Sequence, residues 1–421
     1  MSYAVFQLVF LLIGCSLAVD TLTGFLVSGL GLDLKLSAIY KFGLLLITLF
    51  ALACYSRKKV TVVFCLLLSL LIGPFINLLN ELDVIGFVVD FSYVIKILTP
   101  FIIFLYCTEV VKKWPEKSYQ FGHYVFYFGF LILVFNLVAG VLGYGFSSYG
   151  SDDDGESSIG IKGFFYAGNE VSCLFLILFS YALNRAWNAK RKIYFFMLAP
   201  FVVLSGALIA TKAAMIAGLL LIFIIPLVNE RQRLFRLTWL KISIFAPVIV
   251  MVSIIGVYLV PILEAAGIWA RLVWFYEKKG VMGIILSGRN EFAAKTTESF
   301  YASTGIFEHI WGVGLSGLTK IERMTVEIEP IDLYFWFGIP GITYLTLLFG
   351  AFIYFSYRAT LSQYSTWAPF ALAANLLLAG LSVIAGHTLT SGMLGPLLGL
   401  LNGLVYMDYV NTLNKKKVYS H

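Results

Sequence analysis

The chain has 421 residues, of which 60% are hydrophobic and only 13% are charged. Its polar side chains are too few to cover a water-soluble globule of this size, so the composition predicts a protein that crosses a membrane many times. The formal charge of +7 does not indicate a nucleic-acid-binding protein, because the basic residues form short clusters between apolar runs. The five cysteines lie inside apolar runs without metal-ligand spacing, so neither a metal nor a cofactor is expected.

Apolar runs of helix-spanning length predict an all-α membrane protein with about a dozen transmembrane helices in a single domain over residues 1–421. In chain order the runs are 3–19, 36–55, 60–79, 84–107, 121–144, 164–184, 193–210, 213–228, 242–260, 333–357, 369–385 and 389–409. No basic segment precedes the first run, and Asp20 rather than a small-residue cleavage site follows it. We therefore interpret this run as a retained helix and not as a signal peptide.

Basic clusters between the runs predict the orientation of the chain. If the N-terminus is cytoplasmic, every cluster lies on the cytoplasmic side, which is the positive-inside pattern. Both termini are then cytoplasmic. A small acidic loop (145–163), the helical hairpin tip at Lys212, a large loop (261–332) and the turn at His387 are then expected on the opposite, outer side.

The large loop is the only long polar interval of the sequence and is the expected place for chemistry. It contains LSGRNEF (286–292) and EHIWGVGLSG (308–317), and VEIEPIDLYFWFGIPG (326–341) follows where the chain re-enters the membrane. Arg289 carries a planar set of N–H donors that matches phosphate oxygens, so it is the first candidate for binding a pyrophosphate. The alternative is an ion pair with Glu291 or another local carboxylate.

Three carboxylates at the membrane re-entry, Glu327, Glu329 and Asp332, are candidates for a general base. Pro330 biases Glu329 away from helical geometry and suits the first turn of a helix, so Asp332 is expected in that first turn. The alternative is that Asp332 caps the helix and the two glutamates are loop residues. His387, in IAGHTLTSG, is a further candidate as a base or phosphate ligand, unless it is simply a hydrogen-bonded histidine.

Four more polar residues are candidates for substrate binding. Lys212 occupies the tip of a tight turn between two apolar runs, and Lys162 lies just outside the membrane. Asn169 and Glu170 are expected about two turns into the membrane, where polar side chains are costly and usually face a cavity.

The order of six segments resembles that of the O-antigen polymerase and ligase superfamily, of the Wzy and WaaL type. The segments are IGIKGFFYAGNEVS, GALIATKAA, SGRNEF, WGVGLSG, VEIEPIDLYFWFGIPG and AGHTLTSG. The resemblance covers most of the chain from about Gly145 onward. It implies a GT-C-like, inverting, metal-independent glycosyltransferase of the bacterial inner membrane that uses undecaprenyl pyrophosphate-linked sugars on the periplasmic face. It also implies that Arg289 and Lys212 bind the pyrophosphate, with Lys162 and His387 as helpers.

A departure from the ligase pattern favours the polymerase branch. Ligases typically place a histidine shortly after the glycine-rich turn, where this chain has Glu327-Ile328-Glu329. The expected function is therefore a repeat-unit polymerase for O-antigen, capsule or exopolysaccharide. Its expected partners are undecaprenyl pyrophosphate-linked oligosaccharide, membrane lipid, and chain-length regulator and flippase proteins, with no nucleic acid.

Two alternatives remain open. One is a ligase that transfers the finished glycan to lipid A core or another acceptor. The other is a transporter or flippase that uses Asp90, Lys96 and Glu170 as coupling groups, although the sequence lacks the two related halves that such a transporter normally shows.

Overall fold

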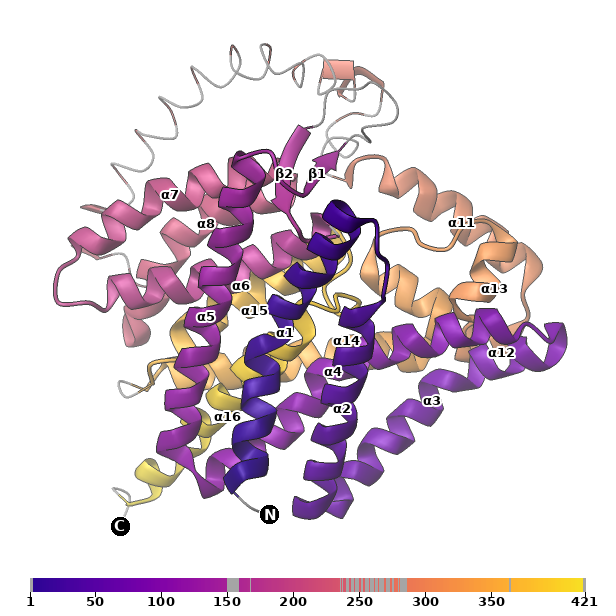
Figure 1. Cartoon of the computed structure of the whole chain (residues 1–421), viewed down its shortest axis with the longest axis horizontal. Helices are drawn as coiled ribbons and strands as arrows, with labels where there is room; N and C mark the ends of the chain where they lie inside the picture. Colours follow the sequence, from indigo (N-terminus) through magenta and orange to yellow (C-terminus); the bar gives the residue numbers. More distant parts are fainter. Residues whose placement is uncertain are drawn as a thin grey trace.

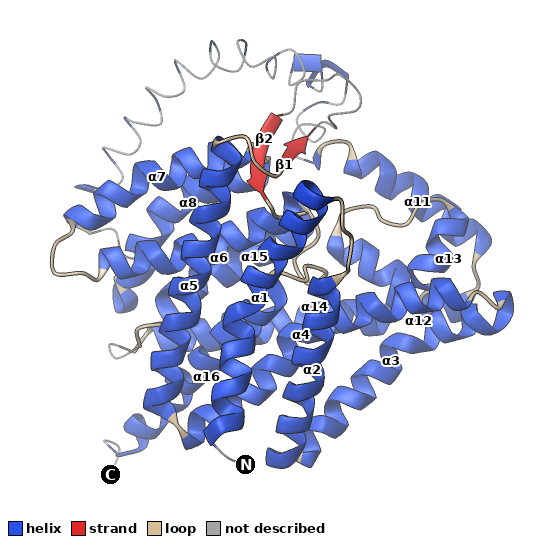
Figure 2. Ribbon diagram, viewed as in Figure 1, coloured by secondary structure: helices blue, strands red, loops and turns tan. Residues whose placement is uncertain are grey.

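The computed structural model is almost entirely helical (Figure 1; Figure 2). It describes residues 3–149, 159–166, 168–234, 286–362 and 365–418, together with scattered residues between 236 and 280. A short antiparallel hairpin of β1 (Phe146–Tyr149) and β2 (Ile159–Gly163) departs from the expected all-α fold. The middle of the acidic loop, the first part of the large loop and the run 242–260 lie wholly or largely outside the described residues.

The helices follow the predicted apolar runs closely. They are α1 (Tyr3–Leu30), α2 (Leu36–Tyr55), α3 (Arg57–Glu81), α4 (Val84–Lys113), α5 (Pro115–Val141), α6 (Gly168–Trp187), α7 (Ile193–Ile209), α8 (Lys212–Asn229), α11 (Arg289–Ser303), α12 (Ile306–Trp311), α13 (Gly314–Ile321), α14 (Glu329–Thr360), α15 (Ala368–Ile384) and α16 (Leu394–Val418). Seven described helices, α1 to α5, α8 and α14, are long and apolar enough to cross a membrane. The predicted helical, membrane-spanning character is thereby confirmed.

Two helix boundaries differ from the prediction for physical reasons. Helix α1 continues past Asp20 to Leu30. The buried carboxylate of Asp20 is tolerated inside the helix because it accepts hydrogen bonds from Ser37 and Lys41 of α2. Helix α6 begins only at Gly168, because β2 occupies the residues before it. Asn169 and Glu170 therefore lie in the first turn of α6.

The core consists of helices that are buried on most of their surface. Helix α16 packs along α4, and α14 packs against α15. The side chains of Asn375 in α15 and Asn402 in α16 are both fully buried, and each donates to the other's oxygen, at 2.8 and 3.2 Å. Reciprocal bonds of this kind satisfy polar groups that would otherwise be costly inside the bundle.

Helix α14 has a sharp break near its beginning. Gly338 has φ 60° and ψ −146°, and a Cβ at this position would lie 2.0 Å from the carbonyl oxygen of Ile310. Only glycine therefore fits here. The backbone N–H of Val313 donates to the carbonyl of Phe335 at 2.9 Å, so the chain between α12 and α13 is fixed against the break.

Both chain ends lie at one end of the bundle (Figure 1). The ring of Tyr3 contacts Trp114, and the hydroxyl of nearby Tyr119 donates to Asp408 at 2.6 Å. The β hairpin lies at the opposite end, where Gly160 approaches Ala210 at the tip between α7 and α8. The loops that carry the predicted site residues meet at this second end.

Candidate functional site

The site is built around an ion pair between Arg289 and Glu327. Arg289 is the first residue of α11 and follows a left-handed turn at Ser287 (φ 55°) and Gly288 (φ 82°). Its Nε and Nη2 donate to Oε2 of Glu327 at 2.9 and 2.7 Å, and its Nη1 donates to the carbonyl of Ile384 at 3.2 Å. The structure thus realises the ion-pair alternative for Arg289, with Glu327 as the partner, and it brings two predicted site residues into direct contact.

Both members of this pair keep capacity to bind a ligand. The three contacts of Arg289 leave one N–H on each terminal nitrogen. Oε1 of Glu327 has no hydrogen bond within the described residues, and a third of this side chain is exposed. The pair can therefore offer two further donors and one further acceptor to a bound molecule.

Lys212 belongs to the same end of the bundle. It is the first residue of α8, whose N-cap Thr211 accepts from the N–H of Ala214. The ammonium of Lys212 donates to Oγ of Ser287 at 2.9 Å. The structure thus links Lys212 to the turn that precedes Arg289, the other predicted pyrophosphate ligand.

Glu329 is a buried group that holds the loop after α15. It is 1% exposed, and it accepts from the N–H groups of Leu389 and Thr390, at 2.7 and 3.2 Å, and from the hydroxyl of Thr388. Helix α14 begins at Glu329, so Pro330 did not keep this residue out of the helix as expected. With its oxygens occupied by the loop, Glu329 is placed as a positioning residue.

Asp332 is also engaged within the protein. It lies in the first turn of α14, as predicted, and accepts from the N–H groups of Val326 and Glu327, at 2.6 and 2.9 Å, and from the hydroxyl of Thr325 at 2.9 Å. These bonds fix the backbone that carries Glu327. Asp332 does not cap α14 as the alternative supposed, because the N-cap residue is Ile328, without a side-chain cap bond, and the carboxylate of Asp332 instead holds the segment that precedes the helix.

His387 lies near Glu327 because the backbone of the preceding residue, Gly386, packs closely against the backbone of Glu327. A Cβ on the preceding Gly386, which has φ 63°, would lie 2.9 Å from the carbonyl oxygen of Glu327. Burial lowers the pKa of His387 below its ordinary 6.5, and the carboxylate of Glu327 only partly offsets this effect. The ring is therefore neutral at neutral pH and can take up a proton.

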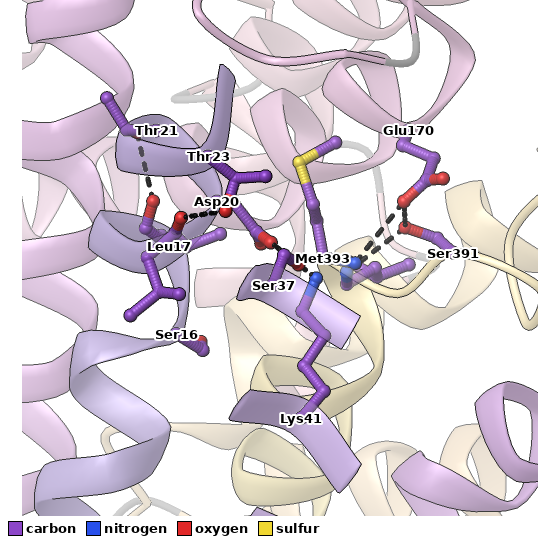
Figure 3. Close-up of polar contacts among 12 residues, drawn as sticks. Ser16, Leu17, Asp20, Thr21, Thr23, Ser37, Lys41, Glu170, Ser391 and Met393 are labelled. Carbon is purple, nitrogen blue, oxygen red and sulfur yellow. Dashed lines mark hydrogen bonds and ion pairs between the residues drawn. The ribbon is translucent and has the colours of Figure 1, made fainter. Parts of the chain in front are cut away.

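Glu170 faces the same loop from α6. Its Oε2 accepts from the hydroxyl of Ser391 at 2.8 Å and from the N–H of Met393 at 3.3 Å (Figure 3). Neighbouring Asn169 is only partly buried. Lys162 stays with its own hairpin: it donates to the carbonyl of Tyr166 at 2.8 Å, and burial lowers its pKa. No contact within the described residues joins Lys162 to the Arg289 cluster, by which we mean Arg289, Lys212, Glu327 and His387.

The residues proposed for a transporter do not form a coupled pair. Asp90 is fully buried and accepts from the N–H and hydroxyl of Ser316, at 3.0 and 2.6 Å, so it fixes the start of α13. Lys96 lies over the ring of Tyr93, 4.6 Å from its centre. The bonds of Asp90 thus join α4 to α13.

Sequence reasoning missed the contact of Asp20 with Lys41, which are 2.6 Å apart (Figure 3). Part of the signal was present, because Lys41 is a charged residue inside the expected run 36–55, whereas Asp20 was expected just after the first run. Their partnership required knowing that α1 and α2 pack side by side.

The fold and this cluster define a helical membrane protein with a cationic and carboxylate-bearing site where the loops meet at one end of the bundle. No group of three or more His, Cys, Asp or Glu side chains able to hold a metal ion occurs in the described part of the chain. Neither a protein-family model nor a curated protein matches this sequence.

Proposed function

We propose that this protein is a repeat-unit polymerase that transfers a growing glycan from undecaprenyl pyrophosphate to a lipid-linked acceptor sugar. The single observation that carries the proposal is the cluster of Arg289, Lys212, Glu327 and His387, which come from four separate segments to one end of the bundle. Fixed cations beside a neutral histidine suit a reaction in which an anionic leaving group departs and a hydroxyl loses its proton.

In the proposed reaction, the acceptor hydroxyl oxygen forms a bond to C1 of the donor sugar while the bond from C1 to the pyrophosphate oxygen breaks. The configuration at C1 inverts. The proton of the hydroxyl goes to the neutral ring of His387, and the negative charge gained by the pyrophosphate meets the remaining N–H donors of Arg289 and the ammonium of Lys212. Fixed donors of this kind stabilise charge that develops in the transition state.

The carboxylates of the site act as positioning residues in this scheme. Glu327 orients the guanidinium of Arg289, Asp332 holds the backbone of Glu327, and Glu329 holds the loop that carries His387. Orientation of this kind lowers the entropy cost of bringing the reacting groups together.

We place the protein in the bacterial inner membrane with a GT-C-like architecture, both termini in the cytoplasm and the site facing the periplasm. The support is the distribution of charge. The basic clusters at the turns 57–59 and 112–117 lie at the end of the bundle that holds both termini, as the positive-inside pattern requires.

The test is an assay of purified protein in detergent with an undecaprenyl pyrophosphate-linked repeat unit, run with and without a chelator and read as glycan length on a gel. A ladder of chain lengths, unchanged by the chelator, is expected. Transfer of one glycan to an added lipid A core acceptor without a ladder would identify a ligase. If no covalent product forms and the lipid-linked unit instead changes leaflet in vesicles, the polymerase proposal is wrong and a flippase is indicated.

A further inference from the structure

A cavity of about 590 Å³ lies beside the loop that carries His387 and is lined by Gly392 and Met393 of that loop. It is enclosed by α1, α2 and α4, by Glu170 at the start of α6, and by the chain that leads into α16. Its volume is in the range typical of small-ligand sites. The wall is mostly apolar, and it includes Val27, Phe42, Leu45, Val88, Phe91 and Ile95.

The cavity reaches the surface of helices that can span a membrane. Phe42 on α2 and Val88 on α4 both line it, and they are 48% and 60% exposed. Ala38 in the first turn of α2 is also an exposed part of the wall. Exposed apolar side chains on spanning helices face the hydrocarbon of a bilayer, so an acyl or prenyl chain can enter here from the membrane.

One cation in the wall forms no ion pair with a described residue. The ammonium of Lys41 is paired with Asp20 at 2.6 Å. Lys96, from the facing side of α4, makes no ion pair with any described residue: it lies over the face of the Tyr93 ring, and Glu170 in the same wall acts on it only through longer-range electrostatics. A lysine inside a membrane segment is costly unless an anion or water meets it, so Lys96 points to an anionic ligand.

A second polar group in the wall of the cavity, the carboxylate of Asp20 beside Lys41, also has an oxygen without a hydrogen bond. Asp20, 8% exposed, uses its Oδ1 for Ser37 and Lys41, while its buried Oδ2 has no hydrogen-bond partner (Figure 3). Buried oxygens without partners are uncommon in native structures. The part of the cavity lined by Asp20, Lys41 and Lys96 therefore suits a head group that carries an anionic oxygen for Lys96 and a hydroxyl or amine donor for Asp20.

We propose that this cavity binds the head group of a phosphate-bearing membrane lipid, with the phosphate on Lys96 and the chain along the apolar wall. The inference goes beyond the proposed transferase activity, because this cavity is separate from the Arg289 cluster and its occupancy is measured as binding. Met393 forms part of the wall, and its N–H bonds to Glu170, so a bound lipid touches the loop that carries His387.

Native mass spectrometry of the detergent-solubilised protein tests the proposal, with undecaprenyl phosphate as the probe. We expect Lys96→Met to weaken binding at least about tenfold, since a charged hydrogen bond in a dry site is lost. Ala38→Trp should block the mouth and weaken binding similarly. Two matched controls should bind as the wild type does: Lys320→Met, which removes a lysine paired with Glu81, and Ile39→Trp, on an exposed neighbour of Ala38 outside the wall.

Further probes identify the chemistry and separate the two sites. Binding that depends on Lys96 should persist in Arg289→Ala protein, whether or not that variant transfers glycan. Phosphatidylglycerol with the same dependence on Lys96 would support the proposal with a diacyl lipid as the source. The proposal fails if the uncharged alcohol undecaprenol binds as tightly as its phosphate, if Lys96→Met has no effect, or if inorganic phosphate alone occupies the site equally well.

Discussion

At the scale of single residues, Arg289 is distinguished by the number of contacts that its planar head makes at once. It holds Glu327, 38 residues further along the chain, and the carbonyl of Ile384, and these contacts leave two of its N–H groups unused. A lysine cannot reproduce this geometry. We predict that Arg289→Lys lowers the rate of glycan transfer by about 100-fold or more, measured as product formed from the lipid-linked donor.

Arg323 provides the control for this substitution. Its guanidinium packs on the ring of Phe292, 4.2 Å from the centre, and makes no contact with Glu327. Arg323→Lys should leave the transfer rate close to that of the wild type. Equal losses in both variants would show that the assay reports general damage and that Arg289 has no special role.

His387 predicts a dependence of stability on pH. Because burial lowers the pKa of this ring in the folded protein, the unfolded chain binds its proton first as the pH falls below 6.5. The contribution of His387 to stability is thus complete above that pH and is lost as the pH falls through the lowered pKa. Thermal unfolding in detergent from about pH 8 to about pH 5 should show this loss.

The variant His387→Asn should have a flatter profile over the same range. Asparagine suits the left-handed backbone at this position, where φ is 61°, so the substitution removes the titrating ring with little added strain. Identical pH profiles in the two proteins would contradict the burial argument for His387.

Asp332 illustrates a residue that acts through another one. Its two carboxylate oxygens accept three hydrogen bonds from the segment 325–327. In asparagine one of these oxygens is replaced by an amide NH2 group, so at least one of the donors loses its acceptor. We expect Asp332→Asn to cost about 1–3 kcal/mol of stability. The exposed Asp33→Asn is the control for thermal unfolding, and an unchanged midpoint in Asp332→Asn would rule out the positioning role.

At the scale of elements, the break in α14 is the most sharply testable feature. Gly338→Ala forces a side chain into a left-handed backbone and against the carbonyl of Ile310, so a large drop in the thermal midpoint is expected. Gly350 lies in the same helix with open space around its Cβ position, so Gly350→Ala should be neutral or mildly stabilising. Equal midpoints for the two variants would contradict the described break.

The sequence predicts the helices well because each apolar run has the length and composition of a spanning segment. It misplaces the end of α1, because the cost of burying Asp20 is offset by Ser37 and Lys41 on another helix. It also misses the break at Gly338, since the apolar pattern continues across that residue. Both errors arise from tertiary contacts that no local pattern contains.

The candidate site was only partly predictable for the same reason. Residue chemistry singled out Arg289, Glu327 and His387, but nothing in their spacing shows that Arg289 and Glu327 bind each other. Glu329 and Asp332 are candidates for the base because they are carboxylates at a membrane boundary. That their oxygens accept backbone N–H groups is visible only in the folded loops.

At the scale of the whole molecule, the gathering of the site loops at one end predicts their exposure to one side of the membrane. In a variant without the native cysteines, Met324→Cys should react with a membrane-impermeant maleimide added outside the cell. Arg191→Cys, exposed in the turn between α6 and α7, should react only after the membrane is opened. Labelling of both positions from outside would contradict the proposed orientation.

The most direct test of the central claim is the rate at which purified protein releases undecaprenyl pyrophosphate from the lipid-linked donor, measured by mass spectrometry in the presence of acceptor. We predict that the wild type releases one carrier for each glycosidic bond formed, and that Arg289→Ala slows release at least about 100-fold while Lys320→Met does not. Release at the same rate from the wild type and from Arg289→Ala would contradict the assignment of this cluster as the site of glycosyl transfer.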